Sequence, residues 1–276
     1  MSSTRGAVHT RRQALHHGVG PALLAVAVLV ATTAIAGCGV FDRAKDTVTS
    51  AVKPSPGRTP IRTVAEPNPH IIDIPAVAAA MSSAVKIRAI APSCQKVLEG
   101  SGFVLSPDRV MTNAHVVAGA SSVTVEANGN PYDATAVSYD PTVDVAILAV
   151  HSLPGNPLAF SDDPADSGAD ALVLGYPAGG NFVATPARIR ETFNMSGPDI
   201  YRKTTVNREV YTIRATVDPG NTGGPLIDTG GRVLGMIFGA AVDDNDTEFA
   251  LTAKEIAPEL ANIGNTEPVA TGSCAS

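Results

Sequence analysis

The sequence predicts an all-β fold of the barrel or sandwich class, and three observations support this prediction. Short runs rich in β-branched residues recur along the chain, bounded by Gly, Pro, Asn and Asp. No alternation of strands with helices and no internal repeat of about 20–50 residues occurs. No Gly-rich phosphate loop is present, so a mononucleotide-binding α/β fold is a poor fit. The predicted strands cover residues 85–90, 102–105, 110–112, 123–126, 145–150, 171–174, 210–217 and 233–238.

Two further stretches have helical patterns. One covers residues 75–83 and the other covers residues 252–263. The second begins with Thr252 and Glu255 at the spacing of a capping box, in which a hydroxyl and a carboxylate satisfy free N–H groups of the first turn. The sequence therefore predicts a β domain with a short helix near its C-terminal end.

Composition limits the classes of partner. The chain has 276 residues, of which 44% are hydrophobic and 17% are charged, so it can bury a sizeable core. Its formal net charge is −6, and residues 1–37 hold three arginines but no lysine or acidic residue, so the remainder is more acidic still. Because phosphate binding needs a concentrated basic surface, we expect no nucleic-acid partner.

The N-terminal residues have the layout of an export signal. Residues 1–20 are basic and polar, and residues 21–36 form an uncharged apolar run that is shorter than the ~20 residues of a spanning helix. The run ends in Ile35-Ala36-Gly37-Cys38, which resembles a bacterial lipobox. This resemblance implies a signal peptide over residues 1–37 and a lipid on Cys38 that anchors the chain to the outer face of the cell membrane.

Two questions about the N-terminus stay open. A retained signal anchor with an incidental Cys38 is the alternative to a lipoprotein. Residues 10–15 also resemble a twin-arginine export motif, so the sequence does not decide between the general and the twin-arginine export routes.

A Pro-rich, charged segment without periodicity follows the leader and predicts a tether over residues 38–71, before a folded domain over residues 72–276. With Cys38 assigned to lipid, two cysteines remain, Cys94 and Cys274. In an oxidising, exported setting we expect these two cysteines to form a disulfide.

Three local motifs stand in the order His, Asp, hydroxyl. Residues 111–117 contain His115, residues 140–148 contain Asp140 and Asp144, and residues 218–226 (Asp-Pro-Gly-Asn-Thr-Gly-Gly-Pro-Leu) contain Thr222. Each motif alone is weak, because a lone His or Asp at a strand end is usually structural and Gly-Gly-Pro is commonly a turn. Together, with Gly-Ser-Gly-Phe-Val at residues 100–104, they resemble the motifs of trypsin-like serine proteases.

Within that family, the sequence is similar to the HtrA-type bacterial proteases and to the membrane-anchored acid-resistance proteases of mycobacteria. The similarity to the mycobacterial group rests on residues 110–120 and 238–244, and the overall resemblance covers roughly residues 80–264. It implies two six-stranded antiparallel β-barrels with a short C-terminal helix. The site then lies between the barrels.

The resemblance also implies a role for each motif. His115 is the base that takes a proton from the nucleophilic hydroxyl of Thr222, and Asp144 fixes the tautomer of His115. Asp140 is the rival carboxylate, and Asp144 is preferred because it directly precedes Val-Ala-Ile-Leu. The backbone N–H groups of Gly220 and Thr222 would form the oxyanion hole.

The specificity pocket is also assigned by resemblance. Thr216 lies at its predicted base, and Phe238, Gly239 and Ala240 form its predicted walls. No carboxylate lies at that base, so we expect a small or medium apolar side chain in the pocket rather than a basic one. No ligand cluster for a metal ion is visible, and we expect no cofactor.

Thr222 departs from the family pattern, which has serine at this position. The added methyl group restricts the side-chain rotamer and crowds a turn built from small residues. Three alternatives follow: a slow threonine-nucleophile protease, a protease fold retained as a peptide- or protein-binding module, or a deliberate serine-to-threonine exchange. Because His115, Asp144 and the glycine turn remain, we favour an extracytoplasmic endopeptidase with protein or peptide substrates. The sequence does not indicate the oligomeric state.

Overall fold

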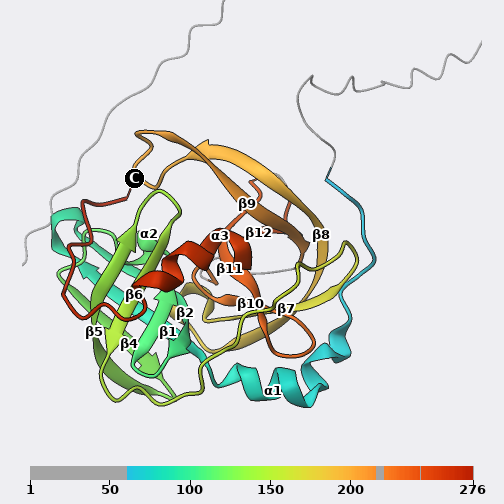
Figure 1. Cartoon of the computed structure of the whole chain (residues 1–276), viewed down its shortest axis with the longest axis horizontal. Helices are drawn as coiled ribbons and strands as arrows, with labels where there is room; N and C mark the ends of the chain where they lie inside the picture. Colours follow the sequence, from blue (N-terminus) through green and yellow to red (C-terminus); the bar gives the residue numbers. More distant parts are fainter. Residues whose placement is uncertain (1–60, 216–220, 243, 276) are drawn as a thin grey trace, which may run out of the picture. The chain divides into compact units, whose positions relative to one another are not determined.

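The computed structural model describes residues 61–215, 221–242 and 244–275, and in this part of the chain twelve strands form two closed barrels (Figure 1). The predicted signal peptide, Cys38 and most of the predicted tether lie outside the described residues. Over the ranges given above, no helix has the length and apolar character needed to cross a bilayer.

The first barrel is antiparallel throughout and closes through a pairing of its first and fourth strands. Its strand order is β1-β2-β3-β6-β5-β4. Val85, Ile87, Val110, Leu148 and Val150 fill its interior, each fully buried. The strands are β1 (Ala84–Ala91), β2 (Lys96–Ser106), β3 (Arg109–Thr112), β4 (Ser122–Ala127), β5 (Asn130–Asp140) and β6 (Val145–Val150).

The second barrel repeats this plan and closes through β7 and β10. Its strand order is β10-β11-β12-β9-β8-β7. Ile189, Ile213, Leu226, Ile237 and Ala250 contribute to its buried interior. The strands are β7 (Asp170–Gly175), β8 (Val183–Pro198), β9 (Thr205–Arg214), β10 (Pro225–Ile227), β11 (Val233–Ala240) and β12 (Thr247–Thr252).

The prediction of two six-stranded antiparallel barrels is confirmed. In Figure 1 the green first barrel and the yellow-to-orange second barrel lie side by side. Four strands, β5, β8, β10 and β12, were not among those predicted. The long strands β5 and β8 expose much of their length, so neither forms the continuous apolar run that marks a buried strand.

Short helices occupy the ends of the domain. The prediction over residues 75–83 corresponds to α1 (Pro75–Met81), preceded by η1 (Pro69–Asp73). Three short helical turns lie between strands: η2 (Pro92–Cys94), α2 (Ala114–Val117) and η3 (Pro177–Gly179).

The C-terminal helix is shorter than its sequence pattern indicates. The Thr252 side chain accepts a hydrogen bond from Glu255 N at 3.1 Å and begins α3 (Ala253–Ile256), as the capping motif predicts. The Glu255 carboxylate instead accepts from Glu209 N at 2.9 Å, so the reciprocal half of the capping box is replaced by a tertiary contact. Pro258 has no N–H to donate, and the chain continues as the 3-10 helix η4 (Ala257–Asn262).

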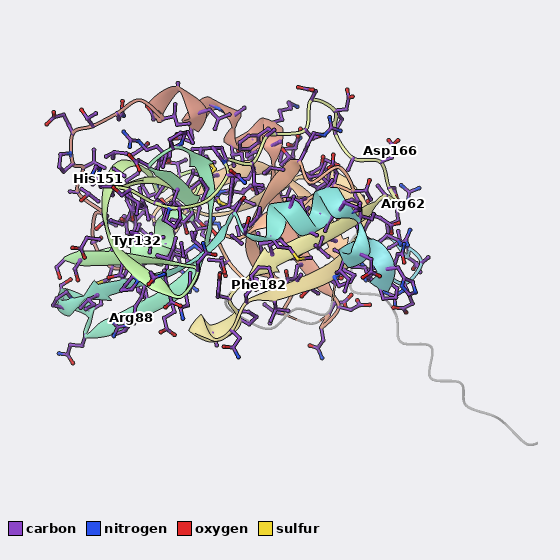
Figure 2. All side chains as sticks on the ribbon, turned by 90° about the horizontal axis from the view of Figure 1, so that it is seen from below. Arg62, Arg88, Tyr132, His151, Asp166 and Phe182 are labelled. Atoms are coloured by element: carbon purple, nitrogen blue, oxygen red, sulfur yellow. A yellow bond between two sulfur atoms is a disulfide. The ribbon has the colours of Figure 1, made fainter. Side chains whose placement is uncertain are left out.

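The last residues of the predicted tether lie along the second barrel. Arg190 Nη1 donates to the Arg62 carbonyl at 2.8 Å, and Arg214 Nη1 donates to the Val64 carbonyl at 3.0 Å. Arg62 and Asp166, which Figure 2 shows at the same side of the molecule, line one cavity of about 800 Å³. None of the predicted site residues lines this cavity.

The C-terminal segment binds the first barrel. Gly119 N donates to the Thr271 carbonyl at 3.0 Å, and Val269 N donates to the Ala136 carbonyl at 2.8 Å. This path brings Cys274 beside Cys94, with their Cα atoms 6.0 Å apart, a separation that a disulfide spans.

Candidate active site

His115 and Asp144 meet because their strands are neighbours. His115 lies in α2, directly after β3, and Asp144 directly precedes β6, which pairs with β3. The His115 Nδ1 atom lies 2.7 Å from Asp144 Oδ2, and the backbone N–H of His115 donates to Asp144 Oδ1 at 2.9 Å. Both carboxylate oxygens therefore contact the same residue, and the imidazole is held in one orientation with Nε2 as the ring nitrogen free of Asp144.

The backbone around Asp144 is held as firmly as its side chain. Asp144 is 3% exposed and has a positive φ of 72°, a conformation that Asp tolerates better than most residues. Its carbonyl accepts from Asn113 Nδ2 at 2.8 Å, and its N–H donates to the Asp140 carbonyl at 3.0 Å. Asn113 was not predicted as a site residue, although it stands two residues before His115.

The two candidate carboxylates have different surroundings. Asp140 Oδ1 accepts from Thr142 N at 2.6 Å and from Val143 N at 3.1 Å, which is the bonding of a turn. The structure thus places Asp144, and not Asp140, against the imidazole.

Opposing influences act on the His115 imidazole. Burial by itself lowers its pKa, but the negative charge of Asp144 and the hydrogen bond to that carboxylate outweigh burial and raise the pKa above its ordinary value of 6.5. The side chain is 33% exposed, so its outer edge can meet a substrate. An imidazole with this pKa accepts a proton more readily than a free histidine does.

Thr222 lies in a turn that joins the two barrels. The N–H of Ser101, on β2 of the first barrel, donates to the Thr222 carbonyl at 2.8 Å. On the second barrel, Gly223 N donates to the Ile237 carbonyl at 2.8 Å, and Ile237 N donates to the Gly224 carbonyl at 2.9 Å. The turn is thereby fixed between β2 and β11.

Glycine is required at the residue after Thr222. Gly223 has a φ of +88°, and a Cβ atom there would overlap the Ser101 carbonyl oxygen and the Thr112 hydroxyl. Thr112 ends β3, three residues before His115. The turn therefore fits closely against the strands that hold His115, while the Thr222 side chain remains partly exposed.

Ser101 links these parts of the site, and sequence reasoning gave it no role of its own. It is fully buried; its carbonyl accepts from Thr112 Oγ1 at 2.7 Å, and its Oγ accepts from Tyr176 N at 2.9 Å. The Gly-Ser-Gly pattern at residues 100–102 is the one sequence signal for this position. Val116 packs so close to Gly100 that no side chain fits there.

The predicted oxyanion and pocket residues are only partly described. Gly220 and Thr216 lie outside the described residues. Phe238 and Gly239 are half-buried at the end of β11, and Ala240 is exposed. The residue in register with Ala240 is Glu248 on β12, a buried acid.

Over the described ranges, no three His, Cys, Asp or Glu side chains come together in a way that could hold a metal ion.

Comparison with known proteins identifies the class. Residues 100–236 match the family model of the trypsin-like peptidase domain. The serine protease Rv3671c of Mycobacterium tuberculosis is 63% identical over 220 residues, which cover 79% of this chain and 55% of that protein. The crystal structure of the active form of Rv3671c protease superimposes with a TM-score of 0.78 at 62% identity, covering 82% of this chain and all of that one.

A more distant relative has the same architecture. The HtrA-type protease AlgW, solved with a tripeptide, gives a TM-score of 0.59 at 26% identity and covers 68% of this chain and 62% of that one. The chain therefore belongs to the trypsin-like serine protease family. It spans 55% of the length of its mycobacterial relative, so the comparison concerns the protease domain and not every part of that protein.

Proposed function

We propose that this chain is an endopeptidase that hydrolyses peptide bonds through His115, Asp144 and the hydroxyl of Thr222. The observation that carries the proposal is the His115–Asp144 pair, at 2.7 Å, beside a turn that hydrogen-bonds Thr222 to the first barrel. A carboxylate bonded to Nδ1 and a partly exposed opposite edge of the ring are the arrangement of a histidine that acts as a base, and a structural histidine does not require both. Its relatives act in the same class: one is named a serine protease, and another is a protease solved with a bound peptide.

The reaction begins when the Thr222 hydroxyl oxygen attacks the carbonyl carbon of the scissile bond. As this bond forms, His115 Nε2 accepts the hydroxyl proton, and Asp144 stabilises the resulting imidazolium through Nδ1. By resemblance to the family, the N–H groups of Thr222 and Gly220 would donate to the oxyanion; Gly220 lies outside the described residues. Each such donor typically contributes about 3–4 kcal/mol of transition-state stabilisation.

The tetrahedral intermediate then breaks down, and the proton moves in the opposite direction, away from His115. The C–N bond breaks as His115 returns its proton to the leaving amine, and an ester between Thr222 and the acyl fragment remains. Water attacks this ester with His115 again as base, which releases the acid product and restores the threonine hydroxyl. Besides the substrate and one water molecule, no further reactant is needed to balance these steps.

The threonine methyl group makes this chemistry slow. The turn is confined at the two residues after Thr222, because a Cβ atom added at Gly223 would overlap Ser101 and Thr112, and one added at Gly224 would overlap the Leu174 carbonyl of β7. A side chain forced off its preferred rotamer costs about 0.5–1.5 kcal/mol, and a nucleophile displaced by about 1 Å can lose ~100-fold in rate. The same crowding is the basis for the alternative, a binding module with little turnover.

Thr222→Ser separates the two functions. It removes the methyl group but keeps the hydroxyl, the base and the oxyanion donors, so we expect hydrolysis of peptide substrates to rise about tenfold or more, chiefly in kcat. His115→Ala in the Thr222→Ser background should abolish the gain. If Thr222→Ser stays inert toward a broad peptide library that the protein still binds, the function is that of a binding module.

We also propose that the protein is exported, lipid-anchored through Cys38 and cross-linked between Cys94 and Cys274. Cys38 lies outside the described residues, so its support is the sequence motif alone. The 6.0 Å separation of the Cys94 and Cys274 Cα atoms supports the cross-link, which belongs to an oxidising compartment. Detergent partitioning of a Cys38→Ala variant tests the anchor, because a variant that remains membrane-bound after signal cleavage contradicts it.

A further inference from the structure

Arg208 on β9 is a buried arginine that holds the turn before Asp144 from the opposite barrel. It is 7% exposed. Its Nε and Nη2 atoms both donate to the Thr142 carbonyl, at 2.9 and 2.6 Å, and its Nη1 atom donates to the Pro198 carbonyl at 3.2 Å. Thr142 lies between β5 and β6 of the first barrel, whereas Pro198 ends β8 of the second. One guanidinium group therefore ties the second barrel to the segment that carries Asp144.

The partners of Arg208 indicate a role in geometry. In the part of the chain that the structure describes, all of its hydrogen bonds go to backbone carbonyl oxygens and none goes to a carboxylate. A cation taken out of water without an opposite charge is costly, and a well-packed apolar side chain often serves stability as well or better. What the guanidinium adds is a rigid, planar set of donors, which fixes the direction of the carbonyl that it binds.

The carbonyl that Arg208 binds belongs to a turn whose successive peptide groups are each held. The peptide group between Thr142 and Val143 is bonded at its oxygen by Arg208 and at its N–H by Asp140 Oδ1, which accepts from Val143 N at 3.1 Å. The next N–H, that of Asp144, donates to the Asp140 carbonyl at 3.0 Å. Asp144 itself has a positive φ of 72°, and such a conformation persists only where the surroundings hold it.

A second contact joins the barrels directly before this turn. Tyr139 on β5 precedes Asp140, and its hydroxyl oxygen lies 2.7 Å from that of Tyr201, which follows β8. The Asp199 carboxylate accepts from the N–H groups of Tyr201 and Lys203, at 2.9 Å each, and so holds the connection between β8 and β9. The hairpin that carries Arg208 is therefore fixed against the first barrel at this position.

We propose that Arg208 is a positioning residue of the peptidase site. By fixing the Thr142 carbonyl, it sets the Asp144 carboxylate against the imidazole of His115. It acts through Asp144 and is not itself one of the reacting groups. The inference rests on the proposed peptidase function and concerns the same site. It also makes the alignment of His115 depend on the packing of the two barrels, because Arg208 belongs to the barrel that carries Thr222.

The first test measures peptide hydrolysis in the Thr222→Ser background of the full chain. Arg208→Met keeps a long, unbranched side chain but removes every donor to the Thr142 carbonyl. Misplacement of a catalytic group by about 1 Å can cost ~100-fold in rate, so we expect kcat to fall by about 100-fold with KM little changed. Arg208→Lys retains a charged donor and should recover part of this loss.

The matched control is Arg190→Met. Arg190 is a buried arginine of the same pair of strands, at 5% exposure, but its hydrogen bonds go to Asp246 and to the Arg62 carbonyl instead of to the first barrel. Loss of Arg190 therefore costs the domain a buried arginine without releasing the turn before Asp144.

The second test does not depend on turnover. The imidazole of His115 is titrated by NMR, with its signals identified by their loss in His115→Ala. Burial lowers the pKa of His115, and the charge of Asp144 with its hydrogen bond raises that pKa above 6.5. A displaced carboxylate raises it less, so we expect the pKa of His115 to fall in Arg208→Met and to stay unchanged in Arg190→Met. The acid limb of kcat/KM should move to lower pH with it, because the neutral imidazole is the active form.

The outcomes separate this role from the peptidase function. A lowered pKa of His115 in Arg208→Met, with no hydrolysis by any variant, would keep the positioning role and overturn the peptidase function. Hydrolysis that Arg208→Met leaves undiminished, or slows with the pKa of His115 unchanged, would overturn the role of Arg208. An equal fall of this pKa in Arg190→Met would overturn it as well. If Arg208→Met does not fold, Arg208→Lys decides by the same measurements, with smaller changes in the same directions expected.

Discussion

Replacing Glu248 by glutamine should change the pH dependence of stability. The folded protein holds a proton on this carboxyl group up to a pKa of about 8, whereas an unfolded glutamate releases it at about 4.5. Between these values the folded state binds more protons than the unfolded state, so the free energy of unfolding falls as the pH rises. Glutamine does not titrate, so Glu248→Gln escapes this loss.

The size of the effect follows from the two pKa values. The shift from 4.5 to about 8 corresponds to a loss of up to about 5 kcal/mol, at a slope of about 1.4 kcal/mol per pH unit. This is a large fraction of the typical stability of a domain, which is about 5–15 kcal/mol. Glu248→Gln should therefore gain stability relative to the parent protein steadily from about pH 5 to about pH 8.

Urea unfolding at a series of pH values measures this directly. Glu191→Gln serves as the control, because Glu191 lies on β8 of the same barrel with a partly exposed side chain. Stability curves for Glu248→Gln and the parent protein that stay parallel over this pH range would contradict a raised pKa of Glu248 in the folded state, since they would show that its carboxyl group titrates alike in the folded and unfolded states.

Two further predictions concern the site and the cysteine pair. Asp144→Asn should lower kcat by about 10⁴-fold while leaving the fold intact, because the amide favours the wrong imidazole tautomer. Asp140→Asn is the control and should have a far smaller effect on kcat. Equal losses of kcat for both variants would contradict the role of Asp144 as the partner of His115. Cys94 and Cys274 are 180 residues apart in the sequence, so reduction of their disulfide should lower the free energy of unfolding by about 4–5 kcal/mol in the chain-entropy model. If a reductant leaves the thermal unfolding temperature unchanged, the two cysteines are not bonded.

Local sequence patterns were sufficient to predict which residues begin strands or lie in turns. The apolar run of β6 places Asp144 at the start of a strand, and the glycine turn marks Thr222, because each signal lies within a few residues of the residue that it marks. The double-barrel architecture followed from the resemblance that these motifs carry. Neither inference needed contacts between distant segments.

The missed features depend on long-range pairing. Ser101 gains its role from Thr112, which lies 11 residues away on the next strand, and from Tyr176 and Thr222, which are distant in the sequence. Glu248 follows a polar segment, Asp-Asn-Asp-Thr, and its burial depends on the pairing of β12 with β9 and β11. Single-sequence patterns contain no register between strands, so they could not place either residue.

Covalent trapping shows whether the Thr222 hydroxyl is the nucleophile. The protein is mixed with a p-nitrophenyl ester of an acylated amino acid, quenched in acid and digested, and the peptides are analysed by mass spectrometry. We expect one acyl group on the Thr222 hydroxyl, and none in His115→Ala, because the attack requires the base. An unlabelled Thr222 in a protein that still hydrolyses the ester, or a label that persists in His115→Ala, would contradict the mechanism.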